Sequence, residues 1–587
     1  MSITFSRREF VKVLSMTGAL GALSGCAKTR NAGESGSLYD LANYGNARLM
    51  HFTDCHAQLL PVYFREPNVN LGFGGLKNQP PHLVGEHLLK HVGIKDKRLE
   101  HAFTYRNFAD YATQYGKMGG FAHLSTLVKN LRHSYRGDSL LLDGGDTWQG
   151  SGTSYKTRGM DMVRACNLLG VDIMTGHWEF TYLEDEVLAN IAAFNGEFIA
   201  HNVKLTEEAL FDEAPAHDYD TGHAFKPYVI KEMGGQPVAF IGQAFPYTPI
   251  ANPSRFIPNW TFGIRDEEMQ QMADQARSEG AKAVIVVSHN GMDVDKKMAS
   301  RVTGVDAILG GHTHDAVPQA LEIANPGGTT LVINSGSNGQ FLGVLDLDIG
   351  ASGVKGYQFT LLPVFADLLP ADKEMQALID EIRAPHGDWL NEELAVSDDL
   401  LYRRGNFNGT FDQVICDGMR AVLDAQIALS PGFRWGTSVL PGSPITMDDL
   451  LTQTCMTYPE TYVREMKGED LKLILEDVAD NLFNEDPYYQ QGGDMVRVGG
   501  MDYTIDPLGS MGGRITDMRL DNGVTIEAGK SYRVAGWATV GSKSPGEPIW
   551  DVVAEYLRSE KTVAVKKLNT PKIAHTSGNK GIADYAG

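Results

Sequence analysis

Short runs of apolar residues alternate with longer amphipathic stretches over residues 46–365. The longer stretches repeat apolar side chains at helical spacing, as "FAHLSTLVKNLRHSY" and "DEEMQQMADQARSEG" do. The short runs have the length of buried strands, and they occupy residues 48–54, 139–146, 171–177, 198–203, 238–245, 283–290 and 306–314. Strands that alternate with helices predict a layered α/β domain.

The remainder of the chain predicts a second domain. Residues 366–394 include "ADKEMQALIDEIRAPHGDWLNEEL", which is rich in helix formers and predicts a linker helix. Residues 395–565 mix strand and helix patterns with Gly/Pro turns and predict an α+β substrate domain, and residues 566–587 are expected to be loosely ordered. A chain of 587 residues is also too long for a single core.

The N-terminus has the pattern of an export signal. The stretch "SRREFVK" is a twin-arginine signature, and a short apolar region follows it within residues 1–26. The signal predicts a periplasmic protein whose polar, glycine-rich residues 27–45 act as a tether. "LSGC" resembles a lipobox, so Cys26 is a candidate for a lipid anchor, although a plain cleavage region can look the same.

The net charge argues against one class of function, and the cysteine spacing excludes another. The formal net charge is -21, which argues against nucleic acid as the main partner because like charges repel. The five cysteines show no C-x-x-C spacing, which excludes a zinc ribbon or a dithiol redox motif.

Acidic and histidine side chains stand where the predicted strands end. Most of the apolar runs finish in Asp or His, often beside glycine: Asp54, His56, Asp146, His177, His289, His312 and His314. Any one of them alone is more often a turn residue or a hydrogen-bonded core histidine. Ligands of α/β folds gather at the carboxyl ends of strands, so the whole set is expected to converge.

Carboxylate and imidazole together suit Mn²⁺, Fe²⁺, Zn²⁺ or Co²⁺ better than calcium. Seven ligands are too many for one cation and reasonable for two, with Asp146 shared between them. Two such cations can activate a bridging hydroxide and bind the oxygens of an anionic substrate.

The order of these motifs resembles the dinuclear metallophosphoesterases of the 5′-nucleotidase family. The resemblance implies a β-sandwich metal domain with flanking helices, followed by a C-terminal domain that closes over the substrate. By position, one metal would be bound by Asp54, His56, Asp146 and His314, and the other by Asp146, His177, His289 and His312.

One motif departs from that family. The nucleotidases have Gly-Asn-His-Glu-Phe-Asp where this chain has "GHWEFT". His177 therefore stands at the position of an asparagine ligand, whereas Trp178 and Thr181 replace a His–Asp dyad that lies near the leaving group.

The loss of the dyad bears on the leaving group. An acid that protonates a departing alkoxide contributes about 10²–10⁴-fold to the rate, and an indole N–H cannot do so because it is not an acid at working pH. A thiol has a pKa of about 8.5 and can depart as a thiolate unaided. Trp178 is thus a candidate catalytic and substrate-contacting residue; the alternative is that it only packs and activity is lost.

Several phrases are similar to the SoxB family, the thiosulfohydrolases of the bacterial sulfur-oxidation (Sox) pathway: "PVYFREPNVNLGFGG", "GGDTWQGSGTSYKTRGMDMV" and "GGHTHDAVP" among them. The resemblance implies two Mn²⁺ ions, and we expect the protein to be a monomer. The resemblance further implies a substrate with a sulfonate on the C-terminal cysteine arm of the carrier protein SoxYZ. Hydroxide held by the metals would attack the sulfonate sulfur, releasing sulfate and leaving a thiolate or persulfide.

Two arginines of the second domain are candidates for sulfonate binding. Arg434 lies in "SPGFRWG", where a guanidinium could form paired hydrogen bonds to the anion, although a surface arginine stacked on Trp435 would give the same pattern. Arg497 in "GGDMVRVGG" is a second candidate. Phe433 and Tyr503 could face the substrate, but core packing is the better interpretation.

Two other functions remain open from the sequence. One is an exported 5′-nucleotidase or sugar-nucleotide phosphohydrolase, which would need an acid other than the missing dyad. The other is a catalytically silent metal-dependent binding module, for which a complete ligand set has no evident purpose.

Overall fold

The computed structural model describes residues 38–541 and 543–585. The predicted export signal and Cys26 lie outside these residues. Among the described helices, none combines the length and the apolar character that a membrane crossing requires.

Two six-stranded sheets form the first domain. One has the order β14 (Gly353–Pro363), β13 (Phe341–Gly350), β1 (Ala47–Phe52), β2 (Asp138–Asp143), β3 (Ile173–Met174), β4 (Glu197–Phe198). The other has the order β11 (Leu321–Asn325), β12 (Gly328–Asn334), β10 (Ala307–Gly310), β9 (Ala283–Ser288), β7 (Gln236–Gln243), β6 (Tyr228–Met233). Strands β1 to β4 are parallel to one another, as are β7, β9, β10 and β12.

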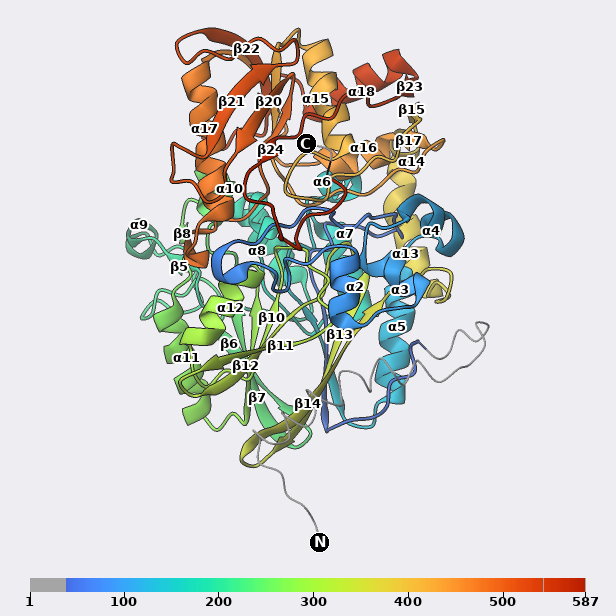
Figure 1. Ribbon diagram of the computed structural model, residues 1–587. Helices are drawn as coiled ribbons and strands as arrows, with labels where there is room; N and C mark the ends of the chain where they lie inside the picture. The colour runs from blue at the N-terminus through green and yellow to red at the C-terminus, as the bar shows by residue number, and fades with distance from the viewer. Residues whose placement is uncertain (1–37, 542, 586–587) are drawn as a thin grey trace.

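The two sheets share one apolar layer. Leu49 and Leu142 of the first sheet belong to the same buried cluster as Phe240, Ile285 and Leu309 of the second. Side chains alternate across a strand, so the opposite faces need helices to cover them. Helices α5 (Phe121–Ser134), α7 (Met160–Leu169) and α13 (Lys373–Arg383) lie beside the first sheet, and α11 (Asp266–Ser278) and α12 (Met292–Arg301) beside the second (Figure 1). The predicted layered β-sandwich with flanking helices is confirmed.

The second domain is α+β, as expected. One sheet runs β18 (Thr461–Lys467), β22 (Ser531–Trp537), β16 (Ile427–Ser430), β19 (Arg497–Gly499), and another runs β21 (Ile515–Leu520), β20 (Met501–Ile505), β24 (Lys572–Ile573). A short third sheet pairs β17 (Pro444–Thr446) and β23 (Thr562–Val563) with β15 (Glu393–Ser397). The second domain contains the helices α15 (Thr410–Val422), α16 (Met447–Thr454), α17 (Gly468–Phe483) and α18 (Ile549–Glu560).

The core is continuous across the junction of the two domains. A single buried cluster contains Trp178 of the first domain together with Trp435 and Tyr458 of the second. The segment between the domains is helical, as expected, and contains α13, the 3-10 helix η4 (Ala384–His386) and α14 (Gly387–Leu390). Buried apolar area of this kind opposes relative motion of the domains.

The described end of the chain differs from the loosely ordered tail that the sequence suggested. Strand β24 pairs with β20, and the residues after it bond to residues 68–84 of the first domain. Tyr585 packs against the core of the second domain and donates a hydrogen bond from its hydroxyl to Pro571 O at 2.6 Å. Polar, glycine-containing residues suggested disorder, but backbone hydrogen bonds to a distant loop order this segment.

Candidate dinuclear metal centre

Each predicted ligand lies in a loop directly after a strand. Asp54 and His56 follow β1, Asp146 follows β2 and His177 follows β3, while His289 follows β9 and the last two histidines follow β10. These loops meet because the strands are parallel and the two sheets face each other. Five of the ligand residues adopt positive φ angles: Asp54 (53°), His56 (45°), Asp146 (58°), His312 (74°) and His314 (57°). Such conformations are uncommon outside glycine and concentrate at functional sites.

The seven side chains form two buried groups that share Asp146. Within each group the potential ligand atoms all lie within 4.8 Å of one another; the groups are Asp54, His56, Asp146, His314 and Asp146, His177, His289, His312. The structure thus brings together the residues that the strand ends predict, in the division that the resemblance implies.

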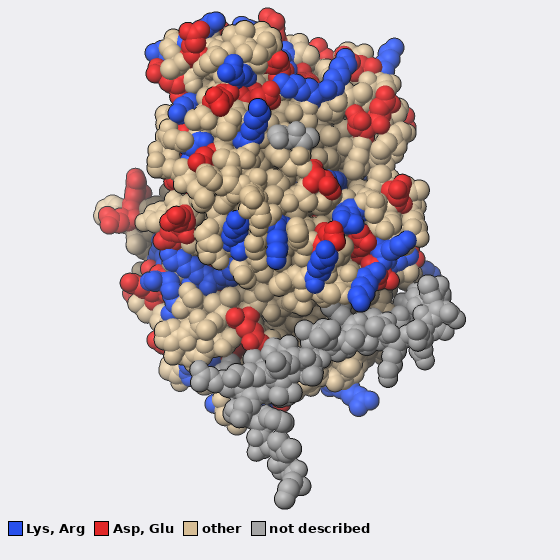
Figure 2. All heavy atoms as spheres, in the orientation of Figure 1, with Lys and Arg blue, Asp and Glu red and all other residues tan. Residues whose placement is uncertain are grey.

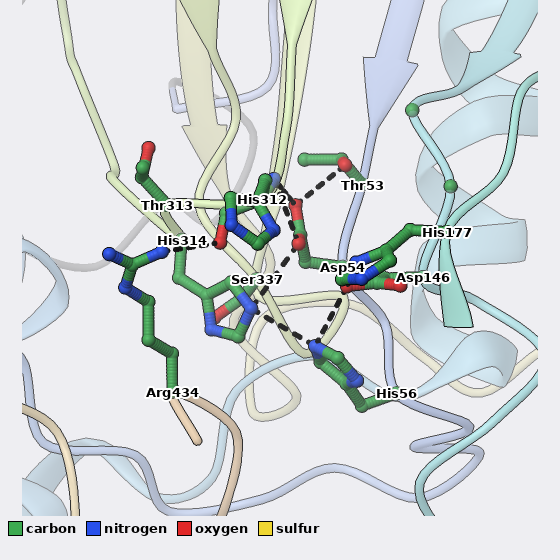
Figure 3. A network of polar contacts seen from close by, with 12 residues as sticks. Thr53, Asp54, His56, Asp146, His177, His312, Thr313, His314, Ser337 and Arg434 are labelled. Carbon is green, nitrogen blue, oxygen red and sulfur yellow. Dashed lines mark hydrogen bonds and ion pairs between the residues drawn. The ribbon is translucent and has the colours of Figure 1, made fainter. Parts of the chain in front are cut away.

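The closest approaches in the two groups join ring nitrogens to one another and to carboxylate oxygens. In the first group His56 Nε2 lies 3.0 Å from His314 Nε2, which is 3.2 Å from Asp54 Oδ1 (Figure 3). In the second, Asp146 Oδ2 lies 3.0 Å from His289 Nε2 and 3.2 Å from His177 Nδ1.

These residues fit a pair of divalent cations. Two carboxylates and five imidazoles converge in a place where each side chain is nearly inaccessible to water. Several of the ring nitrogens, including His177 Nε2 and His56 Nδ1, find no hydrogen-bond partner among the described residues. Buried polar groups are usually paired, and a mixed oxygen and nitrogen donor set is one that Mn²⁺, Fe²⁺, Co²⁺ or Zn²⁺ accepts.

Hydrogen bonds from neighbouring groups orient the ligands. His289 Nδ1 lies 2.6 Å from Gly144 O, which directs Nε2 toward Asp146. Asp54 accepts hydrogen bonds from Thr53 Oγ1 at 2.6 Å and from the backbone N–H of His312 at 3.0 Å. Partners of this kind set the tautomer and direction of metal ligands.

Glu179 is a supporting residue that the sequence analysis missed. Its buried carboxylate accepts hydrogen bonds from the backbone N–H groups of four residues, Asp146, Thr147, Trp148 and His177, at 2.8–3.2 Å. It therefore joins the loop that carries the shared ligand to the loop that carries His177. In the sequence, the feature that could have pointed to Glu179 is its position between Trp178 and Phe180 in the motif "GHWEFT".

The charges of the two groups depend on one another. Burial is the largest influence on His289 and lowers its pKa, but the carboxylates of Asp146 and Asp54 outweigh it and raise that pKa to about 10. Burial alone would raise the pKa of Asp146, yet His177 and His289 bring it well below its ordinary value. A cation that binds here has to displace the proton on His289, so binding is linked to pH.

Trp178 lies between the metal ligands and the second domain. Its backbone N–H donates to Asp146 Oδ1 at 2.7 Å, and its ring centroid is 4.8 Å from that of His177. On the other side the indole meets Phe433 and Trp435 edge-on, at 5.7 and 5.3 Å. Phe433 and Trp435 are themselves stacked, 4.0 Å apart. Trp178 is thus a packed residue that also contacts the shared ligand.

Arg434 reaches the site from the second domain. Its guanidinium donates to Gly493 O at 2.8 Å and to His312 O at 3.4 Å (Figure 3), and Nε lies 3.9 Å from Asp494 Oδ1. Arg404, which the sequence analysis missed, donates to Thr313 O at 2.7 Å and lies 3.9 Å from Asp494. A cavity of about 740 Å³ is lined by both arginines and by His312.

Arg497 and Tyr503 lie elsewhere. Arg497 is fully buried, donates a hydrogen bond to Gly405 O and forms ion pairs with Asp494 and Asp412. The prediction that Arg497 contacts the substrate is therefore wrong, and its role is to support Asp494. A long-range ion pair of this kind leaves no pattern in the local sequence. Tyr503 belongs to the core of the second domain.

The matches to known proteins agree with this geometry. Residues 396–552 match the family described as 5′-nucleotidase, C-terminal domain. Among curated relatives, the trifunctional nucleotide phosphoesterase protein YfkN of Bacillus subtilis is 27% identical over 473 residues, covering 73% of this chain and 31% of its own length. The 5′-nucleotidase of Rattus norvegicus is 26% identical over 330 residues, covering 51% of this chain and 54% of its own. The chain thus spans only about a third to a half of these two relatives.

Solved structures cover almost the whole chain. The 5′-nucleotidase precursor of Thermus thermophilus has a TM-score of 0.70 at 21% identity, covering 90% of this chain and 99% of its own, and supports the fold alone. The sulfate thiohydrolase SoxB of Thermus thermophilus, solved with glycerol, has a TM-score of 0.85 at 35% identity, covering 92% of this chain and 98% of its own. The chain therefore belongs to the SoxB family, a branch of the 5′-nucleotidase superfamily of metallophosphoesterase hydrolases.

Proposed function

We propose that this hydrolase is a thiosulfohydrolase that removes sulfate from a sulfonated sulfur chain on a carrier-protein cysteine. The observation that carries the proposal is Trp178, whose buried indole stands where the nucleotidases have an acid. Neither it nor Thr181, whose hydroxyl donates to Trp178 O at 2.8 Å, can protonate an alkoxide. A site of this kind suits a leaving group that departs as an anion.

The bond changes balance without an external oxidant. Water oxygen bonds to the sulfonate sulfur, the bond from that sulfur to its neighbouring sulfur breaks, and the electron pair leaves with the thiolate or persulfide. The products are sulfate, the carrier's thiolate or persulfide, and the two protons of the water, which pass to solvent. A thiol pKa of about 8.5 makes this departure feasible near neutral pH.

Two bound divalent cations, for which we propose Mn²⁺, would supply Lewis acidity and lower the pKa of a coordinated water. The chain's own residues do the rest. Arg434 and Arg404, at the wall of the cavity, would bind the sulfonate oxygens, and a planar guanidinium suits that task. The packed indole would exclude water from the departing sulfur.

The proposal includes the carrier protein, the cell compartment and the oligomeric state of the enzyme. SoxYZ would present its cysteine arm to the cavity, and the enzyme would act in the periplasm as a monomer, with a lipid on Cys26 as an optional anchor. Arg404 and Arg434 in the cavity wall, where Arg514 also lies, favour an anionic group at the end of such an arm.

The decisive test is sulfate release from a thiosulfate-conjugated carrier cysteine by the Mn-loaded protein. We expect Arg434→Lys to lower kcat/KM by about 10-fold or more, because a hydrogen bond to a charged group is lost. Arg533→Lys, an exposed arginine of the same domain, is the matched control and should be neutral. The absence of sulfate release by the unaltered protein would refute the proposal.

A second candidate is phosphoester hydrolysis, which the match to the 5′-nucleotidase C-terminal domain favours. AMP and UDP-glucose offered to the same preparation separate the two. Phosphate release faster than sulfate release would establish the second candidate.

A further inference from the structure

The chain end crosses from the second domain back to the first. Residues 571–585, here the C-terminal strap, begin with strand β24 on β20 and then lie on residues 68–84, here the cavity loop. In Figure 1 the strap is the dark red segment that descends over the front of the molecule to the blue loops at the domain junction.

The strap binds the cavity loop through backbone groups. Asn70 N donates to Gly581 O at 2.7 Å, Val84 N donates to Lys580 O at 3.1 Å, and Ala583 N donates to Asn68 O at 3.0 Å. Asn579 Nδ2 adds a hydrogen bond to Gly72 O at 2.9 Å. Among the described residues no ion pair joins the strap to the cavity loop, so hydrogen bonds and apolar packing attach it. Figure 2 shows this face of the molecule, on which much of the surface between the charged side chains is uncharged.

The same loop is inserted into the second domain. Val69 and Leu71 belong to the core cluster of that domain, against which Ile582 of the strap also packs. Leu71 N donates to Asn406 Oδ1 at 2.7 Å. The loop is therefore held by apolar packing and a hydrogen bond in the second domain, and by hydrogen bonds to the strap.

Asn406 connects the loop to the arginine at the metal centre. Its Nδ2 donates to Asp494 Oδ1 at 3.0 Å, and that oxygen lies 3.9 Å from Arg434 Nε. Burial would raise the pKa of Asp494, but Arg434 and its arginine neighbours lower it, so it remains a carboxylate. The path from strap to Arg434 thus runs through hydrogen bonds of the cavity loop and Asn406 and ends in the 3.9 Å ion pair of Asp494 with Arg434.

The cavity loop is itself a wall of the cavity. Asn70 to Leu76 and His82 line it together with residues of the second domain. His82 Nε2 lies 2.9 Å from Asp293 Oδ2 in α12, so the loop is also tied to the helix that follows His289.

We propose that the C-terminal strap is a positioning element of the substrate site: through Asn579 and Ile582 it sets the cavity loop and, through Asn406 and Asp494, the guanidinium of Arg434. The identity of the substrate rests on the proposed function; the mechanical role does not. A strap that only added stability would affect the whole chain alike, whereas a positioning element acts on the loop and on ligand binding.

The test compares Asn579→Ala and Ile582→Ala with Lys580→Ala, whose side chain is exposed. Hydrogen exchange of the Asn70 and Val84 amides should accelerate about 10-fold or more in the two test variants, while β9 amides and the Mn²⁺ content stay unchanged. The affinity for inorganic thiosulfate should fall about 10-fold and the KM for the carrier conjugate should rise about 10-fold, while kcat changes by less than about twofold. Lys580→Ala should match the unaltered protein.

Unchanged loop exchange, or equal acceleration throughout the chain, overturns the proposal. Faster loop exchange with unchanged thiosulfate affinity overturns the link to Arg434. If the unaltered protein hydrolyses no carrier conjugate, the proposed function fails, and the exchange and thiosulfate measurements still decide the role of the strap.

Discussion

The backbone N–H of Trp178 donates a 2.7 Å hydrogen bond to Asp146, the carboxylate shared by both ligand groups. The residue that replaces the nucleotidase acid therefore helps to position the metal centre while its ring packs against the second domain. A substitution of the Trp178 side chain is expected to change the packing against the second domain, whereas the backbone hydrogen bond to Asp146 does not depend on the side chain.

Restoring the dyad should restore some phosphoester chemistry. We expect Trp178→His with Thr181→Asp to raise phosphate release from AMP by about 10-fold, the lower part of what a positioned acid contributes. Trp178→Phe, which keeps an aromatic ring and adds no acid, is the control and should show no gain. Equal rates in the three proteins would contradict the leaving-group argument.

Gly492 should be essential for the ligand His312. A Cβ at Gly492 would lie 2.0 Å from His312 Nε2, whereas at Gly493 the nearest atom is Gly432 O at 3.7 Å. Both glycines have positive φ, 80° and 78°, so alanine costs about 1–2 kcal/mol of backbone strain at either. Gly492→Ala alone should weaken binding at one metal site by about 10-fold or more, measured by titration with Mn²⁺. Equal affinities in the two variants would exclude the contact.

His177 belongs to one ligand group only. His177→Ala should lower bound Mn²⁺ from about two to about one per chain, measured by elemental analysis after gel filtration. His87→Ala, at an exposed histidine, is the control. Unchanged metal content would remove His177 from the ligand set.

Glu66 should make the protein less stable at high pH. Burial, aided by Asp315 and opposed by Arg404, raises its pKa from 4.5 to about 8. The folded state therefore holds a proton that the unfolded state releases, so the free energy of unfolding falls as pH rises from about 4.5 to about 8. Glu66→Gln removes this titration, so its free energy of unfolding relative to that of the unaltered protein should be more favourable at pH 9 than at pH 5, as measured by urea unfolding. A stability difference independent of pH would show that Glu66 is ionised in the fold.

The sequence by itself determined the layered fold and the candidate ligands. Strand periodicity is local, and parallel strands bring their carboxyl ends to one edge, so Asp and His at strand ends had to meet. The exchange of His and Asp for Trp178 and Thr181 was likewise legible in one short motif.

Only the tertiary structure decided which other residues support the site. Arg404 donates to Thr313 O and Asn406 accepts from Leu71 N across the boundary of the two domains. Arg497 turns inward to Asp494, and the chain end binds a loop about 500 positions away in sequence. Such contacts depend on how the domains pack, and no local periodicity or spacing encodes that packing.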